Sequence, residues 1–304
     1  MSESLKINVQ SEIGKLEAVI LHTPGAEVEN MTPGTAQRAL YSDILNLSIA
    51  QHEYAQLSGV LEKYTKTYQV EELLKRVLDD SQSRATLIGK ICINERATDY
   101  YEDLMDMNSK SLAKCLIEGV PAKINSLTAY LKDEYYALYP LYNFYFTRDA
   151  SVSIGNNVII CKMANKVRVR ESLIMEAIFK NSGAFDCGLI NIPEMNPGNA
   201  GVFMEGGDML IAAEDIILVG NGLRTSTQGI DSLISYLCKQ KNEKKQHIIV
   251  QELPQSPESF IHLDMVFTLL DRDKCMVFEP LILGDNQYQT VHITIDNGKV
   301  SKIK

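Results

Sequence analysis

The sequence has no long apolar segment of the kind that crosses a membrane or directs secretion. No run approaches the roughly 18 consecutive apolar residues that suggest a transmembrane helix. The first residues, MSESLKINVQSEIGK, include no apolar core of a signal peptide. We therefore expect a soluble, cytoplasmic protein that has no membrane partner.

The sequence also lacks clustered metal ligands and an excess of positive charge. Its six cysteines are scattered without a CxxC pair, and its five histidines are dispersed. Because zinc sites usually need clustered ligands, we predict neither a metal site nor a cofactor, and we expect reduced, mostly buried thiols. The 39 acidic residues exceed the 30 basic ones, giving a net charge of −9, so nucleic acid is not an expected partner.

The pattern of apolar residues changes along the chain. With 304 residues, 45% of them hydrophobic, the chain can form one large domain or two ordinary ones. From about residue 35 to 135, apolar residues recur three and four apart, which predicts helices. After Asn143 short apolar runs between turn residues predict strands, with helices at 168–181 and 225–240. We predict a single domain of residues 1–304 with a helical insert of about residues 70–140.

A recurring unit begins at residue 146 and again at residue 203. FTRDASVSIGNNVIICKM and FMEGGDMLIAAEDIILVGN each predict two strands joined by a tight turn, followed by a helix and another strand. A repeated ββαβ unit favours a radial, repeated α/β architecture. Alternating strands and helices are equally compatible with an open α/β sheet, which is the alternative.

The segment IHLDMVF, residues 261–267, places a histidine and an aspartate in an apolar run. If it is a strand, His262 and Asp264 point to the same face, because strand side chains alternate. Burying an unpaired polar group costs about 2–7 kcal/mol. We therefore interpret this pair as functional.

Other polar groups lie at the ends of predicted strands in the second half of the chain. Each alone has an ordinary explanation. The RD pair at 148–149 can be a surface ion pair, worth about 0–1 kcal/mol, and EGGD at 205–208 can be a turn whose glycines supply positive φ. The arginine of LRTS, at 223–226, can pair locally. The groups are Arg148 and Asp149, Glu205 and Asp208, Arg224, and His262 with Asp264.

Together these groups predict the chemistry of one ligand. Paired carboxylates bind the fork of a guanidinium, and arginines bind a carboxylate with the same bidentate geometry. A histidine beside an acid can serve as general acid and base. The predicted ligand has a guanidinium at one end and a carboxylate at the other, which describes arginine.

Several stretches of the sequence resemble the arginine deiminase family of guanidine-modifying enzymes. The matching stretches are VQSEIGKLEAVILHTPG, FTRD, FMEGGDML, GNGLRTS and HLDMVFTLLDRDK, and they extend over nearly the whole chain. The resemblance implies a pentein-type propeller of ββαβ repeats with an inserted helical subdomain. It also implies hydrolysis of L-arginine to L-citrulline and ammonia, without a cofactor. We expect a homo-oligomer whose partner molecule is the small substrate.

The resemblance also implies roles for individual residues. Asp149 and Asp264 would hold the guanidinium, and Glu205 with His262 would move protons. The substrate carboxylate would be bound by Arg168, Arg224 and Asn143. In the family a cysteine thiolate attacks the guanidinium carbon and forms a thiouronium intermediate.

The sequence departs from the family in its last part. Nothing after His262 matches the cysteine motif of the family, and we interpret Cys275, in DRDKCMVFEP, as a core thiol on a strand. The last repeat is not matched either, so we expect a shortened chain that is inactive. The alternatives are a non-catalytic arginine-binding or regulatory relative, a related amidinotransferase or dimethylarginine hydrolase, and substitution of the nucleophile by another of the six cysteines.

Overall fold

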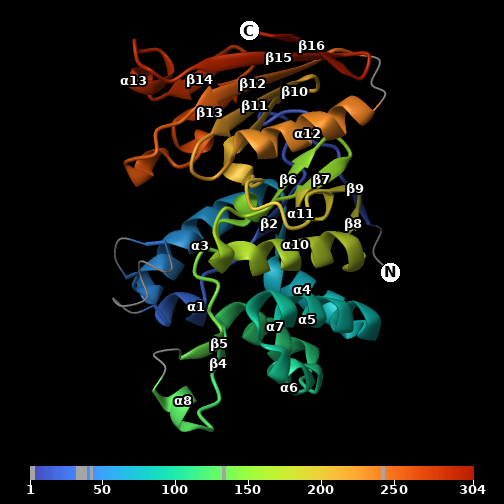
Figure 1. Ribbon diagram of the computed structural model, residues 1–304, viewed down its shortest axis with the longest axis vertical. Coiled ribbons are helices and arrows are strands. Elements are labelled where there is room, and N and C mark those ends of the chain that lie inside the picture. Colours follow the sequence, from blue (N-terminus) through green and yellow to red (C-terminus); the bar gives the residue numbers. More distant parts are fainter. Residues whose placement is uncertain (1–3, 32–39, 42–43, 132–134, 241–243) are drawn as a thin grey trace. The chain divides into compact units, whose positions relative to one another are not determined.

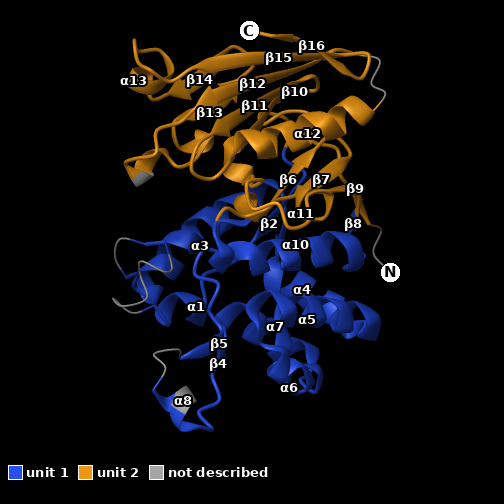
Figure 2. Cartoon of the chain, in the orientation of Figure 1, with its two compact units in different colours: residues 1–3, 16–147, 165–185 blue, residues 4–15, 148–164, 186–304 orange. Residues whose placement is uncertain are grey.

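The computed structural model describes residues 4–31, 40–41, 44–131, 135–240 and 244–304. The chain divides into two compact units, shown in blue and orange in Figure 2. Unit 1 comprises residues 1–3, 16–147 and 165–185, and unit 2 comprises residues 4–15, 148–164 and 186–304. The chain passes between the units several times, and two of these crossings lie within α9 (Thr147–Ala150) and β8 (Phe185–Asp186).

Unit 1 is mainly helical (Figure 1). Strands β2 and β3 pair in parallel, with Ala18 opposite Lys66, and β4 pairs with β5. The described elements of unit 1 are β2 (Ala18–Leu21), α1 (Ala26–Glu29), α3 (Leu47–Tyr64), β3 (Lys66–Gln69), α4 (Val70–Asp79), α5 (Ser81–Glu95), η1 (Thr98–Tyr100), α6 (Tyr101–Met105), α7 (Ser109–Glu118), β4 (Val120–Pro121), α8 (Leu127–Tyr130), β5 (Tyr136–Leu138), η2 (Lys166–Arg168) and α10 (Val169–Asn181).

The core of unit 1 follows from the helical spacing of its apolar residues. In α4 the buried side chains recur three and four apart, which places them on one face. That face packs against α7 and α10, and α10 also packs against α5. The buried residues of α4 are Val70, Leu73, Leu74, Val77 and Leu78.

Unit 2 contains most of the strands. Its largest sheet has the order β10-β11-β12-β15-β16, and a smaller one has the order β6-β7-β9. The described elements of unit 2 are β1 (Leu5–Lys6), β6 (Ser151–Ile154), β7 (Asn157–Ile160), β9 (Gly188–Asn191), α11 (Ile192–Met195), η3 (Gly206–Asp208), β10 (Met209–Ala213), β11 (Ile216–Asn221), α12 (Thr227–Lys239), β12 (Gln246–Glu252), η4 (Glu258–Phe260), η5 (Leu263–Met265), β13 (Phe267–Asp271), β14 (Lys274–Val277), α13 (Glu279–Ile282), β15 (Thr290–Asp296) and β16 (Lys299–Ile303).

The predicted ββαβ order is present twice. Strands β6 and β7 form an antiparallel hairpin, α10 follows, and β9 pairs in parallel with β7. Strands β10 and β11 form the second hairpin, α12 follows, and β12 pairs in parallel with β11. The α/β class is therefore confirmed, and no sheet among the described residues closes into a barrel.

Three expectations about local structure are wrong. Of the helices expected from residue 35 onward, residues 47–64 are helical (α3) but the described residues 40–41 and 44–46 are not; residues 35–39 and 42–43 lie outside the described residues. Cys275 does lie on a strand, β14, but it is exposed and belongs to no core. The third is the strand expected at residues 261–267.

Within residues 261–267, Leu263–Met265 form a 3-10 turn, η5, and β13 begins only at Phe267. The backbone N–H of Leu263 donates to the side chain of Asp208, and the N–H of Val266 donates to the carbonyl oxygen of Leu263. These two N–H groups are therefore not available to a strand partner. The alternation argument fails as a result: His262 is buried whereas Asp264 is exposed.

The single domain and the helical insert of about residues 70–140 remain predictions. That range contains α4, α5, η1, α6, α7 and α8, together with the short strands β4 and β5. Over the described residues, none of the helices has the length and apolar character needed to cross a membrane.

Candidate active site

The polar groups of unit 2 are positioned where strands begin or end, as predicted. Asp149 lies in α9 directly before β6, and Glu205 precedes η3 and β10. His262 directly precedes η5, which leads into β13, and Arg224 follows β11. Segments far apart in the sequence thereby contribute to one cluster.

His262 lies between two carboxylates. Its Nε2 is 3.1 Å from Glu205 Oε2, within hydrogen-bond distance, and its Nδ1 is 4.0 Å from Asp149 Oδ1. All three side chains are buried, Glu205 completely. The imidazole is therefore held in an orientation in which it can exchange a proton with Glu205.

Two glycines make this close packing possible. A Cβ added to Gly207 would lie 2.9 Å from both Asp149 Oδ1 and the His262 ring, and one added to Gly206 would lie 2.0 Å from the carbonyl oxygen of Arg148. Neither glycine has a positive φ. The explanation of EGGD as a positive-φ turn is therefore wrong, because these glycines are needed for close approach.

Glu205 is oriented by further contacts. Its Oε1 accepts a hydrogen bond of 3.1 Å from the N–H of Ala164, and it lies 3.9 Å from a terminal nitrogen of Arg224. The N–H of Glu205 donates to the Thr225 hydroxyl. The structure thus brings together Asp149, Glu205, His262 and Arg224.

The carboxylates around His262 change its protonation. Burial lowers the pKa of His262, but the hydrogen bond to Glu205 and the charges of Asp149, Asp208 and Glu205 outweigh burial, so the pKa is raised above its ordinary value. Asp264 is exposed as a residue, but partial desolvation of its carboxylate raises its pKa. The charges of His262 and Arg148 lower this pKa, and the charge of Asp149 raises it further.

Asp208 is a functional candidate whose role the sequence did not predict. It is fully buried, its Oδ1 accepts a 3.0 Å hydrogen bond from the N–H of Leu263, and its Oδ2 has no hydrogen-bond partner among the described residues. Burial raises the pKa of Asp208 to about 7, despite the lowering effect of His262. Asp208 therefore connects η3 to η5 while remaining largely protonated below neutral pH.

Arg148 has a structural role different from the surface ion pair with Asp149 that is usual for an RD sequence. Its guanidinium makes a bidentate contact with Glu12, at 2.8 and 3.2 Å. It also donates to the carbonyl oxygens of Gly206 and Met209. Arg148 therefore connects the N-terminal segment to the EGGD segment, and Glu12 was missed because no local pattern marks it.

Arg168 and Asn143 belong to unit 1. Arg168 donates from Nε and a terminal nitrogen to Glu171, at distances of 2.8–3.1 Å, and it also donates to the carbonyl oxygen of Asn143 at 3.4 Å. Arg168 and Glu171 are both buried. The structure therefore brings Arg168 and Asn143 together and adds Glu171, whose position one turn into a helix gave no signal in the sequence.

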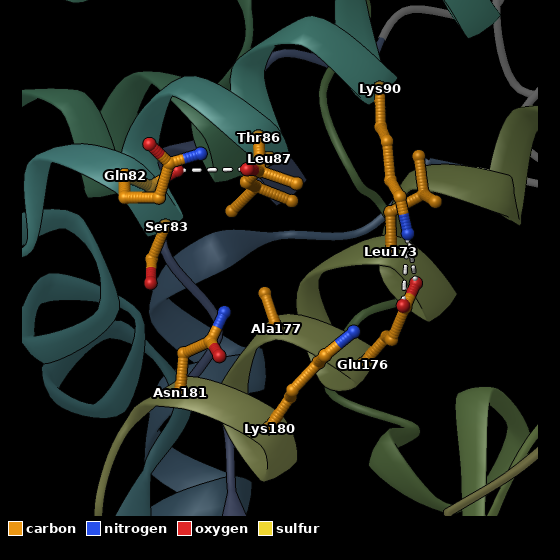
Figure 3. Close-up of a pocket in the computed structure, with 10 residues that line it drawn as sticks. All are labelled: Gln82, Ser83, Thr86, Leu87, Lys90, Leu173, Glu176, Ala177, Lys180 and Asn181. Carbon is orange, nitrogen blue, oxygen red and sulfur yellow. Dashed lines mark hydrogen bonds and ion pairs between the residues drawn. The ribbon is translucent and has the colours of Figure 1, made fainter.

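Unit 1 also has an open pocket of about 200 Å³ between α5 and α10 (Figure 3). Its principal charged pair is Lys90 with Glu176, 2.9 Å apart. None of the residues predicted to act on substrate lines it. The pocket therefore has no part in the chemistry predicted from the sequence.

The cluster in unit 2, an imidazole between two buried carboxylates, is suited to the chemistry of proteins that bind a cation and move protons. The family model described as "Arginine deiminase" matches residues 37–304. The chain belongs to the arginine deiminase family, hydrolases that act on carbon–nitrogen bonds of linear amidines. The resemblance predicted from the sequence is confirmed.

Curated relatives agree with this assignment. An arginine deiminase of Staphylococcus epidermidis is 31% identical over 306 residues, which cover 96% of this chain and 74% of that protein. One of Bacillus cereus is 33% identical over 301 residues, which cover 94% of this chain and 72% of that protein.

Similarity to solved structures is weaker. SxtG, an amidinotransferase from Microseira wollei, has a TM-score of 0.48 and 15% identity, covering 89% of this chain and 69% of that chain. A mutant of AgrE in binary complex with L-arginine has a TM-score of 0.49 and 14% identity, covering 88% of this chain and 28% of that chain. Similarity of this level does not define the fold further.

Proposed function

We propose that this chain binds L-arginine, with the guanidinium of the ligand placed among Asp149, Asp264, Glu205 and His262. The observation that carries the proposal is the buried imidazole between Glu205 and Asp149, at 3.1 and 4.0 Å. A planar guanidinium presents five N–H donors in a fixed fork, which suits several carboxylates at once. Family membership supports arginine as the ligand.

Electrostatics supports a cationic ligand. Four carboxylates, those of Asp149, Glu205, Asp208 and Asp264, influence the pKa of His262 or are influenced by its charge. Of the two nearby arginines, Arg148 is neutralised by Glu12. The raised pKa of His262 shows that these carboxylates favour a positive charge among them, and a bound guanidinium would supply such a charge.

The remaining roles are proposed from the family resemblance. Glu205 and His262 act as the acid–base pair that protonates leaving ammonia and activates water in the deiminase reaction. Arg168, Arg224 and Asn143 bind the α-carboxylate. The repeated ββαβ order of unit 2 and α10 supports a pentein-type propeller.

We further propose that the 304-residue chain binds arginine without hydrolysing it at a rate typical of the family. Burial raises the pKa of Cys92, Cys115 and Cys187, which disfavours the thiolate. Cys161 is fully buried, Cys238 is half-buried on α12, and Cys275 is exposed on β14. Without a thiolate at the guanidinium carbon, the covalent route through a thiouronium intermediate is closed.

The second candidate activity is dimethylarginine hydrolysis or amidinotransfer. It shares the guanidinium chemistry, and solved structures of such proteins are among the distant matches. The curated relatives at 31–33% identity are arginine deiminases, so arginine is the better supported ligand. Competition by methylated arginine separates the two candidates, because a deiminase-type site should prefer arginine.

The test is calorimetric titration of L-arginine into the purified chain and its variants. Asp149→Asn should weaken binding at least tenfold, because a buried charge-assisted contact is worth about 1.5–3 kcal/mol. Asp285→Asn, which changes an exposed carboxylate, is the control and should bind as the wild type does. Equal affinities of all three proteins would refute the proposed site.

A further inference from the structure

Three side chains of the cluster form a possible set of metal ligands. One ligand atom from each of Asp149, Glu205 and His262 can be chosen so that all three lie within 4.8 Å of one another. All three residues are buried, and they come from sequence positions 56 and 57 residues apart. A search for closely spaced ligands in the sequence therefore could not find this set.

The distances are close to those that a small divalent cation requires. Oxygen and nitrogen ligands lie about 2.0–2.2 Å from zinc, which places two tetrahedral ligands about 3.4 Å apart. Glu205 Oε2 and His262 Nε2 are already 3.1 Å apart. Asp149 faces the other ring nitrogen, with its Oδ1 4.0 Å from Nδ1. Because the three ligand atoms lie within 4.8 Å of one another, the longest separation has to shrink by up to about 1.4 Å to reach 3.4 Å.

The surroundings also favour a cation. Asp208 is a fourth carboxyl group near His262 and Glu205, and its buried Oδ2 lacks a hydrogen-bond partner among the described residues. The absence of a side chain at Gly207 leaves Asp149 and His262 free of an intervening Cβ, which would lie 2.9 Å from each. A divalent cation would compensate charge that Arg224, at 3.9 Å from Glu205, offsets only in part.

We propose that Asp149, Glu205 and His262 bind a divalent cation of the zinc class, and that the cation excludes arginine from the same carboxylates. One imidazole and two carboxylates are ligands suited to zinc or manganese, and three protein ligands leave a position for water. Metal binding stands on the geometry alone, whereas the exclusion of arginine rests on the proposed function.

The experiment is a zinc titration of the metal-stripped chain by calorimetry. The wild type should bind one zinc ion in this cluster. His262→Gln should weaken that binding at least tenfold, because mutating even a residue that only hydrogen-bonds to a metal ligand lowers metal affinity by about 10–100-fold. No stoichiometric binding by the wild type would overturn the proposal.

The matched control removes one histidine of a second pair that could bind zinc. His247 Nδ1 and His292 Nε2 lie 2.9 Å apart on β12 and β15 and could bind zinc themselves. His292→Gln should leave the affinity within twofold of the wild type. Loss of zinc binding in His292→Gln together with its retention in His262→Gln would overturn the proposal.

Cobalt provides a second readout on the unmodified chain, which does not depend on whether a variant folds. Cobalt bound to one imidazole and carboxylates should give visible d–d absorption without the near-ultraviolet charge-transfer band of a thiolate ligand. A strong thiolate band would place the metal at a cysteine and overturn the proposal.

Competition completes the test and separates the two proposals. Saturating L-arginine should weaken the apparent zinc affinity at least tenfold, and zinc should weaken arginine binding by the same factor. If arginine binds and zinc does not, the metal site is wrong and the proposed function stands. If zinc binds and arginine does not, the proposed function is wrong and the metal site stands. If both bind without competing, the shared site is wrong.

Discussion

At the scale of single residues, the site depends on small and uncharged groups as much as on charged ones. Gly207 permits the approach of Asp149 and His262, since any Cβ there would overlap both. Asp208 keeps η3 and η5 connected through the N–H of Leu263. Both residues therefore act on the position of the side chains around them.

Gly207→Ala should disrupt the cluster. The added methyl group would lie 2.9 Å from Asp149 and His262, so one of these side chains must move, and arginine affinity should fall at least tenfold. Gly89→Ala is the control, because a Cβ there meets nothing within 4 Å in α5; it should raise stability by about 1 kcal/mol. Unchanged arginine binding by Gly207→Ala would show that its packing is unimportant.

Asp208→Asn should change how stability depends on pH. A carboxyl whose folded pKa is raised to about 7 from about 3.9 in the unfolded chain binds more protons when folded. Stability is therefore highest below pH 4 for this group and is lost as pH rises to 7. Asparagine has no proton to lose and can still accept from Leu263, so the variant should gain up to about 4 kcal/mol relative to the wild type at pH 8.

Urea unfolding of both proteins at pH 5 and pH 8 measures this difference. The advantage of Asp208→Asn should be larger at pH 8. An advantage that is the same at both pH values would mean that Asp208 does not titrate between them.

At the scale of elements, the sequence predicted the order of strands and helices better than the contacts between them. The hairpins at β6-β7 and β10-β11 have clear apolar runs and turn residues, and α12 lies within the helix predicted at 225–240. The turn at η5 could not be predicted, because it depends on Asp208, 55 residues away. Long-range partners such as Glu12 with Arg148 leave no periodic signal.

The N-cap of α12 is a test of this local level. The Ser226 side chain accepts a hydrogen bond of 3.0 Å from the N–H of Gly229 and another from the N–H of Phe203. Ser226→Ala should lower the free energy of unfolding by about 1 kcal/mol, measured by urea denaturation. Thr227→Ala, at the next and exposed position, should cost clearly less; equal losses would contradict the capping role.

At the scale of the whole molecule, the candidate ligands are distributed between the two units. Asp149, Glu205, His262, Asp264 and Arg224 belong to unit 2, whereas Asn143 and Arg168 belong to unit 1. Residue chemistry grouped the candidates of unit 2, but Asn143 and Arg168 joined them only through the family resemblance, because spacing along a chain does not reveal which compact unit contains a residue. Their joint action on one substrate remains a proposal.

The 304-residue chain should form almost no citrulline from arginine. General acid–base help is worth about 10²–10⁴-fold, whereas loss of the members of a catalytic unit can cost about 10⁶-fold. From a typical kcat of about 10 s⁻¹, such a loss leaves about 10⁻⁵ s⁻¹. Citrulline assays at saturating arginine, beside an active arginine deiminase, measure it; turnover within tenfold of that control would point to Cys161, Cys187 or Cys275 as the nucleophile.

The central claim, that the cluster around His262 recognises a guanidinium, is tested most directly by comparing L-arginine with L-citrulline. The two molecules have nearly the same shape, but citrulline has a neutral urea group in place of the cationic guanidinium. Calorimetric titration of both into the wild-type chain at pH 7 should show binding of arginine at least tenfold tighter, because only arginine supplies charge-assisted hydrogen bonds to the carboxylates. Equal affinities, or no binding of arginine at all, would contradict the claim.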